Sequence, residues 1–267
     1  MKHIARKRFG QNFLHDANII RRIVDAIHPA PDDLMVEIGP GQGALTDPLL
    51  KHLQHLHVIE LDRDLIPVLR ERFARNGLEI HEADALKFDF RTLFQEQPLR
   101  VVGNLPYNIS TPLLFHLLGY QQNIRDMHFM LQLEVVDRLS ARPGNKDYGR
   151  LSVITQYYCQ VDKLFPVPPG AFNPPPKVMS AIVRLIPRPC PWQAQDTDLF
   201  EKVVKTAFAQ RRKTLRNNLK QILDPALLDQ LDIDLSLRPE QVSLQEFVKL
   251  SNDIGTLAPS LASSSKE

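Results

Sequence analysis

The sequence predicts an α/β fold, in which a doubly wound parallel sheet is followed by a small all-α C-terminal domain. Three observations support this prediction. Short apolar runs alternate with helix-like runs over the first half of the chain, a glycine-rich loop follows the first apolar run, and the sequence after residue 191 has helical patterns only. A length of 267 residues is enough for one large and one small domain.

The strand-like runs are short, aliphatic and bounded by turn residues. They lie at 34–39, 56–62, 78–84, 99–103 and 127–133. Helix-like runs lie between them at 44–53, 64–75 and 112–120. Because this alternation is typical of βαβ units, we expect these strands to be parallel.

A proline-rich region follows this pattern. Nine of the 21 prolines lie between residues 160 and 191. The apolar runs 161–167 and 178–186 flank the richest part, and we expect them to be late strands, arranged as a hairpin at the far side of the sheet. The predicted domains are therefore 1–190 and 191–256, and a Ser-, Ala- and Pro-rich tail at 257–267 is expected to be disordered.

Composition excludes several classes of protein. The net charge is only +2, so any nucleic-acid contact must come from local basic clusters, one of which lies at residues 2–8.

The two cysteines, Cys159 and Cys190, are far apart and give no disulfide framework or zinc motif. No apolar run is long enough to span a membrane, and the basic N-terminus lacks the apolar segment of an export signal. We expect a cytoplasmic monomer.

The loop Glu37-Ile-Gly-Pro-Gly-Gln-Gly43 ends the first strand and opens a helix. Gly39 and Gly41 allow a tight turn and close approach of a ligand to the backbone. Glu60 ends the next strand, where a carboxylate can accept both ribose hydroxyls of a nucleoside. Asp84 ends the third strand beside the same crevice, where it could meet an adenine amine. The pattern predicts a nucleoside-containing cofactor.

Two kinds of cofactor fit this pattern. Gly39, Gly41 and Ala44 satisfy a relaxed dinucleotide fingerprint, so a nicotinamide-dependent oxidoreductase is one candidate. S-adenosylmethionine also carries an adenosine ribose. The segment Gln11-Asn-Phe-Leu14 has no role in a nicotinamide-dependent oxidoreductase, so it argues against that class. It could instead be a hydrophobic staple before a helix, with Asp16 as the N-cap.

The run Asn104-Leu-Pro-Tyr107 at the exit of the fourth strand suggests chemistry on an adenine amine. That nitrogen is a poor nucleophile because its lone pair is delocalised into the ring. The side-chain oxygen of Asn104 and a loop carbonyl can accept its two hydrogens, Pro106 stiffens the loop, and Tyr107 offers a stacking face. Ordinary turn chemistry is the simpler reading of these residues taken alone.

Five motifs together resemble the ribosomal RNA adenine dimethylase family, and within it the branch that acts on the small ribosomal subunit. They are Gln11 to Leu14, Glu37 to Gly43, Asn104-Leu-Pro-Tyr-Asn-Ile-Ser110, Phe172-Asn-Pro-Pro-Pro-Lys-Val178 and Phe208-Ala-Gln-Arg-Arg-Lys-Thr-Leu-Arg-Asn-Asn-Leu219. The resemblance implies a Rossmann-like methyltransferase sheet, S-adenosylmethionine as methyl donor, and dimethylation of the N6 amines of two adjacent adenosines in a hairpin loop of small-subunit (16S) rRNA. It also implies a role in small-subunit biogenesis, on rRNA within a pre-assembled subunit.

The same resemblance assigns site residues. Cofactor contacts are implied at Asn12, Leu14, Gly39, Gly41, Glu60, Asp84 and Asn104. The catalytic set is Asn104, Leu105, Pro106 and Tyr107, with Phe172 near the target base and opposite Tyr107. Met179 departs from the family pattern, which often has Asp or Asn there. Relatives that act on the large subunit usually have Ile in place of Leu105, so Leu105 favours the small-subunit branch.

Residues 199–223 read as one amphipathic helix with a basic arc. Arg212, Lys213 and Arg216 lie on that arc, and we expect them to contact RNA phosphates, although a solvated helix face is the alternative. His52, His55 and His57 lack a carboxylate or cysteine at ligand spacing, so no metal site is predicted. The functional alternatives are a large-subunit rRNA methyltransferase, a nicotinamide-dependent oxidoreductase, and a non-catalytic ribosome-assembly or transcription factor.

Overall fold

A computed structural model describes residues 12–73 and 77–261. The chain divides into two compact units, each with its own core. Unit 1 comprises Met1–Val136 and Val161–Pro187, and unit 2 comprises Asp137–Gln160 and Arg188–Glu267. The division near residue 188 lies close to the expected linker. The grouping of 137–160 with the C-terminal part was not expected from the sequence.

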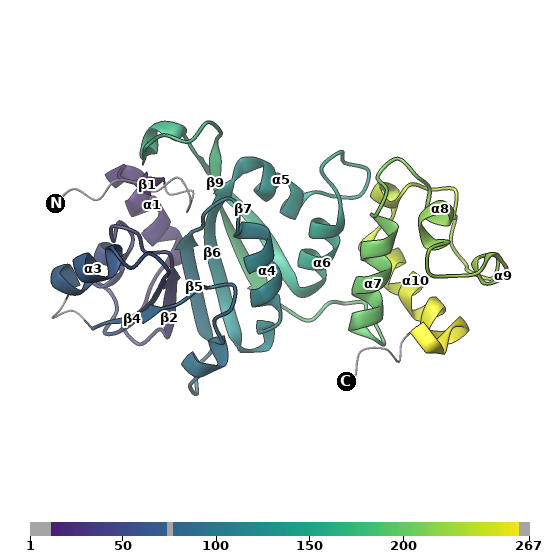
Figure 1. Cartoon of the computed structure of the whole chain (residues 1–267), viewed down its shortest axis with the longest axis horizontal. Coiled ribbons are helices and arrows are strands. Elements are labelled where there is room, and N and C mark those ends of the chain that lie inside the picture. Colours follow the sequence, from purple (N-terminus) through teal and green to yellow (C-terminus); the bar gives the residue numbers. More distant parts are fainter. Residues whose placement is uncertain (1–11, 74–76, 262–267) are drawn as a thin grey trace. The chain divides into compact units, whose positions relative to one another are not determined.

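Unit 1 is built on a seven-stranded sheet whose strands lie side by side in Figure 1. The strand order is β4-β3-β2-β5-β6-β9-β7. The strands are β2 (Met35–Ile38), β3 (Leu56–Glu60), β4 (Leu78–Glu82), β5 (Leu99–Asn104), β6 (Ile124–Gln132), β7 (Cys159–Val167) and β9 (Ser180–Pro187). The α/β prediction is confirmed, since every strand-like run of the sequence lies in this sheet.

The direction of the strands explains the mixed character of the sheet. The pairs β2–β3, β2–β5, β3–β4 and β5–β6 are parallel, as expected for βαβ units. The pair β6–β9 is antiparallel. All four residues of β2 are buried, which is typical of a central parallel strand covered on both faces.

The helices of unit 1 connect these strands. They are α1 (Ala17–Ile27), α2 (Thr46–Leu49), α3 (Leu65–Phe73) and α4 (Ser110–Leu118), with short 3₁₀ turns η2 (Phe90–Leu93), η3 (Gln121–Asn123) and η4 (Pro169–Ala171). The side chain of Asp16 caps α1 by accepting hydrogen bonds from the amides of Asn18 and Ile19. The helix α5 (Leu133–Ser140) begins in unit 1 and ends in unit 2.

Unit 2 is helical apart from the first residues of β7. Its helices are α6 (Arg150–Tyr158), α7 (Thr197–Ala207), α8 (Leu215–Leu219), α9 (Pro225–Leu228) and α10 (Leu244–Leu257), with 3₁₀ turns η5 (Pro239–Gln241) and η6 (Pro259–Leu261). The helix α7 packs against α6, α8 and α10. Phe200 of α7 and Phe247 of α10 are fully buried and anchor this core.

The prediction of one continuous helix over 199–223 is wrong. The helix α7 ends at Ala207, and α8 begins only at Leu215. Asn218 is fully buried, and its side chain accepts a hydrogen bond from the amide of Gln210 (3.1 Å) and donates to the carbonyl of Gln210 (3.3 Å). These bonds satisfy the backbone of a turn, so an interrupted helix is stable here.

The C-terminal tail is only partly described. Residues 257–261 form the end of α10 and η6, and residues 262–267 lie outside the described residues, as do residues 1–11 with their basic cluster. Among the helices of the described part of the chain, none is both long and apolar enough to cross a membrane.

Candidate active site

The carboxyl ends of β2, β3 and β5 and the loop after β4 meet around a cavity of about 370 Å³ in unit 1. Ligands of open α/β sheets bind at this edge, where the strand order reverses. The lining includes every residue predicted to bind the cofactor and all four residues of the Asn104–Tyr107 loop: Asn12, Leu14, Gly39, Gly41, Glu60, Asp84, Asn104, Leu105, Pro106 and Tyr107. The structure therefore brings together residues that are up to 95 positions apart in the sequence, from Asn12 to Tyr107.

The glycine loop has the backbone geometry that only glycine adopts easily. Gly39 has φ of 67° and Gly41 has φ of 58°, both in the left-handed region. The amide of Gly39 donates to the carbonyl of Ile59 on β3 (2.9 Å), which fixes the loop to the next strand. The ring of Phe13 lies where a side chain on Gly41 would have to be, 3.2 Å from an added Cβ. A side chain at either glycine would strain this wall of the cavity.

Glu60 is held in place by the backbone around it. One carboxylate oxygen accepts from the amide of Gly41 (3.3 Å), and the other accepts from the amide of Asp62 (2.8 Å). Burial raises the pKa of Glu60, while these two hydrogen bonds act in the opposite direction. These bonds fix the carboxylate in the cavity wall, where it can accept hydrogen bonds from hydroxyl groups of a ligand.

Glu37 is a site residue that the sequence reasoning quoted but did not assign. It is fully buried at the end of β2 and lines the cavity, and the hydroxyl of Thr46 donates to its Oε2 (2.6 Å). Burial raises its pKa to about 7, and the nearby Glu60 acts in the same direction. The signal was present in the sequence, because a carboxylate two residues before a glycine loop must face a strand end.

The loop after β5 is braced at both ends. The amide nitrogen of Asn104 donates to the carbonyl of Asn12 (3.1 Å), so the side-chain oxygen remains as the acceptor. The hydroxyl of Tyr107 lies 2.7 Å from Oγ of Ser180 on β9, and burial raises the pKa of Tyr107. Leu105 is buried. These contacts hold the amide and the aromatic ring at the cavity wall.

Phe172 lies on a short strand that pairs with residues of the cavity wall. It belongs to the short strand β8 (Phe172–Asn173), which pairs with β1 (Phe13–Leu14) so that Phe172 lies opposite Leu14. Its side chain is 3% exposed and packs in the hydrophobic core, and it is not among the residues lining the cavity. The structure links Phe172 to the site through Leu14, and its position near the target base, opposite Tyr107, stays a prediction.

Met179 departs from the family pattern without disturbing the backbone. Its carbonyl accepts from the amide of Leu133 (2.9 Å), and its side chain is exposed. A polar side chain is therefore not needed to brace this end of the proline-rich loop.

The three basic residues expected to contact RNA belong to unit 2 and do not share one helix face. Arg212 and Lys213 are exposed in the turn between α7 and α8. Arg216 lies on α8, where its guanidinium donates to the carboxylate of Asp229 (2.6 Å). Two of the three cations are therefore presented on a turn, and the third is already in an ion pair.

Comparisons with known proteins identify the family of the chain. The family model for ribosomal RNA adenine dimethylase matches residues 2–254. A protein of Saccharophagus degradans named ribosomal RNA small subunit methyltransferase A is 62% identical, over 94% of this chain and 95% of that protein. A protein of the same name from Aromatoleum aromaticum is 59% identical over 97% of both chains.

Solved structures show the same fold over nearly the whole chain. A dimethyladenosine transferase from Plasmodium falciparum is similar with a TM-score of 0.77 and 27% identity, covering 92% of this chain and 98% of that one. The 23S rRNA methyltransferase ErmE has a TM-score of 0.68 and 26% identity, with coverage of 91% and 99%. By sequence and by fold, the chain belongs to the ribosomal RNA adenine dimethylase family.

Proposed function

We propose that the chain transfers methyl groups from S-adenosylmethionine to the N6 amines of two adjacent adenosines in a hairpin loop of small-subunit (16S) rRNA. One observation carries the proposal: the glycine loop, Glu60, Asp84 and the Asn104–Tyr107 loop line a single cavity. The relatives named small subunit methyltransferase A are 57–62% identical. The 23S rRNA methyltransferase is 26% identical, which supports the small subunit over the large one.

The cavity suits the nucleoside end of S-adenosylmethionine. Its volume of about 370 Å³ lies in the usual range for small-molecule sites. Glu60 offers a fixed carboxylate to ribose hydroxyls, and Asp84 lies beside it with one oxygen already accepting from the amide of Leu86 (3.0 Å). The other oxygen of Asp84 is the acceptor that we assign to the adenine amine of the cofactor.

Bound S-adenosylmethionine would supply an electrophilic methyl group on a sulfonium sulfur. The protein then has to present the target nitrogen and make its lone pair available. Asn104 accepts one hydrogen of the target amine through Oδ1, because its nitrogen is committed to the carbonyl of Asn12. A loop carbonyl accepts the second hydrogen. With both hydrogens held, the nitrogen becomes more tetrahedral and points its lone pair at the methyl group.

Tyr107 positions the base. An aromatic face beside a flipped base contributes about 1–3 kcal/mol through stacking. The bond to Ser180 limits rotation of the Tyr107 side chain, so the stacking plane is set before the base arrives. Phe172, which pairs with Leu14 on the cavity wall, is proposed to lie near the target base opposite Tyr107.

We also propose which part of the chain contacts RNA, which form of the rRNA is the substrate, and that the enzyme is a monomer. Unit 1 carries the chemistry, and the helical C-terminal part, 191–256, contributes RNA contacts through Arg212 and Lys213. We propose that the substrate is rRNA within a pre-assembled small subunit, and that the enzyme works as a monomer. Cys159 and Cys190 are free thiols, which suits a reducing cytoplasm.

The first experiment separates the two cofactor classes. The intact protein is heated with S-adenosylhomocysteine, with NAD, or with neither, and its melting temperature is followed. A ligand that binds only the folded state raises this temperature. We expect stabilisation by S-adenosylhomocysteine and not by NAD. Stabilisation by NAD alone would favour the oxidoreductase and overturn the proposal.

A further inference from the structure

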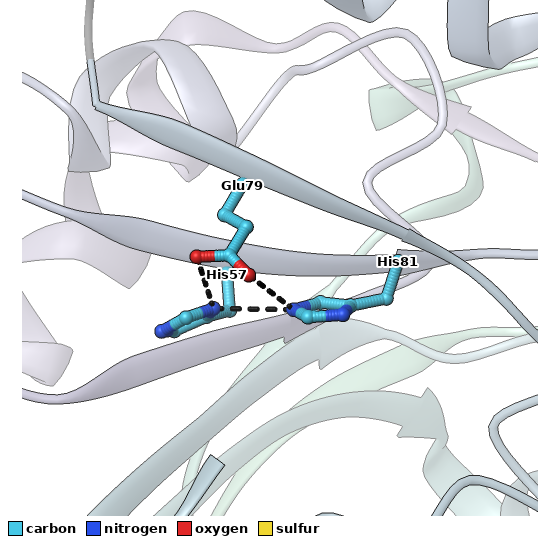
Figure 2. Close-up of side chains that lie close together, drawn as sticks. All are labelled: His57, Glu79 and His81. Carbon is cyan, nitrogen blue, oxygen red and sulfur yellow. Dashed lines mark hydrogen bonds and ion pairs between the residues drawn. The ribbon is translucent and has the colours of Figure 1, made fainter. Parts of the chain in front are cut away.

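A trio of metal-ligating side chains lies on the sheet of unit 1, apart from the cavity. His57 is on β3, and Glu79 and His81 are on the edge strand β4. In the parallel register His57 is opposite Glu79, and His81 is two residues further along β4. Residues two apart on a strand share a face, so β4 presents both of its side chains beside His57. Figure 2 shows the three side chains pointing toward one another.

The distances between the donor atoms suit a tetrahedral ion. Nδ1 of His57 lies 3.1 Å from Nε2 of His81. Oε2 of Glu79 is 3.5 Å from Nδ1 of His57, and Oε1 is 3.7 Å from Nε2 of His81. Zinc binds imidazole nitrogen and carboxylate oxygen at about 2.0–2.2 Å, which places tetrahedral ligand atoms about 3.3–3.6 Å apart. The two ring nitrogens and the carboxylate group already lie at nearly this spacing, with one oxygen of Glu79 nearest to each histidine.

We propose that His57, Glu79 and His81 bind a divalent transition metal ion, with Zn²⁺ as the best match. Two imidazoles and one carboxylate are a donor set typical of zinc. The side chains of His57 and His81 are 12% and 22% exposed, and that of Glu79 is 65% exposed. An ion can therefore reach the trio from solvent, and water would complete a tetrahedral set of four ligands.

The alternative is a purely hydrogen-bonded trio. Two ring nitrogens 3.1 Å apart can share only one hydrogen, so in the ion-free protein one histidine donates and the other accepts. A bound ion would replace this shared hydrogen and accept a lone pair from each of the two ring nitrogens.

The position of the trio indicates a structural role. His57 lies near the start of β3, whereas Glu60 ends that strand at the cavity. A bound ion would join edge strand β4 to β3, while the methyl-transfer site would keep its own residues. The ring of His81 also packs edge-on against Phe88, with centroids 5.3 Å apart, which fixes one ligand in orientation. Among the described residues, this is the one group of three such side chains close enough to share an ion.

The test is a metal titration of the full-length protein without a histidine tag. The protein is treated with a chelator, dialysed, and titrated with Zn²⁺ by calorimetry, and with Co²⁺ by visible absorption. We expect one equivalent of Zn²⁺ and the strong visible bands of tetrahedral cobalt. Loss of an outer-sphere partner typically weakens metal binding by about 10–100-fold, so His57→Gln and His81→Gln should each weaken it at least about tenfold.

The matched control is His52→Gln, an exposed histidine outside the trio, which should bind Zn²⁺ as the unaltered protein does. Glu79→Gln is a second ligand variant whose side chain is mostly exposed, so it does not endanger folding. Zn²⁺ should also raise the melting temperature of the unaltered protein and of His52→Gln more than that of Glu79→Gln. Binding that survives in the ligand variants, or the absence of stoichiometric binding, would overturn the proposal.

Discussion

The hydroxyl of Tyr107 lies 2.7 Å from Oγ of Ser180, which is fully buried at the start of β9. The bond joins the loop that follows β5 to a strand two positions away in the sheet, since β6 lies between β5 and β9. The loop that follows β5 is thus tied to the antiparallel part of the sheet. The hydroxyl of Tyr107 serves this attachment, and in the proposed function its ring serves stacking.

Tyr107→Phe should retain most methyl transfer, because the ring remains, and should lose about 0.5–1.5 kcal/mol of unfolding free energy with the hydrogen bond. Ser180→Ala is the matched change and should lose a similar amount. Tyr107→Ala should abolish most activity, because the stacking face is removed. Methyl-transfer rates and denaturant unfolding of the three variants check this. Equal loss of activity in Phe and Ala would assign the hydroxyl a direct role.

Glu60→Ala should weaken binding of S-adenosylmethionine by about 1.5–3 kcal/mol, the contribution of hydrogen bonds to a charged group. The change also releases the amides of Gly41 and Asp62, so the glycine loop loses part of its support. Calorimetry measures the affinity. The control is Glu82→Ala at the end of β4, where the carboxylate pairs with Arg63 (2.7 Å). Unchanged affinity in Glu60→Ala would remove Glu60 from the site.

Glu37 should make stability depend on pH. Its pKa is about 7 in the folded protein against an ordinary 4.5, so between these values the folded state holds a proton that the unfolded chain has lost. The free energy of unfolding should therefore fall as pH rises from about 4.5 to about 7 because of this group. Glu37→Gln should remove that part of the decline.

Denaturant unfolding at several pH values, compared between Glu37→Gln and the unaltered protein, checks this prediction. The difference between the two curves isolates the contribution of Glu37 to the pH dependence. Glu71→Gln, an exposed carboxylate on α3, is the control and should leave the curve unchanged in shape. Parallel curves for Glu37→Gln and the unaltered protein would show that folding does not raise the pKa of Glu37, and would contradict the prediction.

The turn between α7 and α8 should carry RNA contacts. Replacing Arg212 and Lys213 with Gln should weaken RNA binding most at low salt, and flatten the log–log salt dependence by about 0.7–0.9 for each lost phosphate contact. Arg216→Gln should have less effect, because Arg216 already pairs with Asp229. The control is Arg70→Gln, which removes one positive charge from the exposed surface of α3. Identical salt slopes for all variants would mean that this turn is only solvated.

The sequence predicted the sheet well because buried parallel strands such as β2 are continuous apolar runs with turn residues at both ends. It did not predict the break after Ala207, since that depends on the buried amide of Asn218 reaching Gln210. It did not reveal that the segment 137–160 belongs to unit 2, because contacts between distant segments leave no local pattern.

The candidate site also combines features that the sequence predicts with features that it does not predict. Gly39, Glu60 and Asp84 could be found from their spacing, because the ends of parallel strands meet at one edge. The raised pKa of Glu37 depends on burial, which spacing does not report. The trio around His57 depends on strand register, since Glu79 and His81 are more than 20 residues away along the chain.

Labelled methyl transfer tests the proposed chemistry and the proposed substrate together. The protein is incubated with labelled S-adenosylmethionine and, in parallel, with unmethylated small subunits, free 16S rRNA, large subunits or DNA. Asn104→Ala is the matched variant, because it removes the acceptor for the target amine and leaves Glu60 and Asp84 in place. We predict N6,N6-dimethyladenosine at two adjacent positions of small-subunit rRNA, and almost none with Asn104→Ala. Label that appears in the large subunit or in DNA, or no transfer to any of the four, would contradict the account.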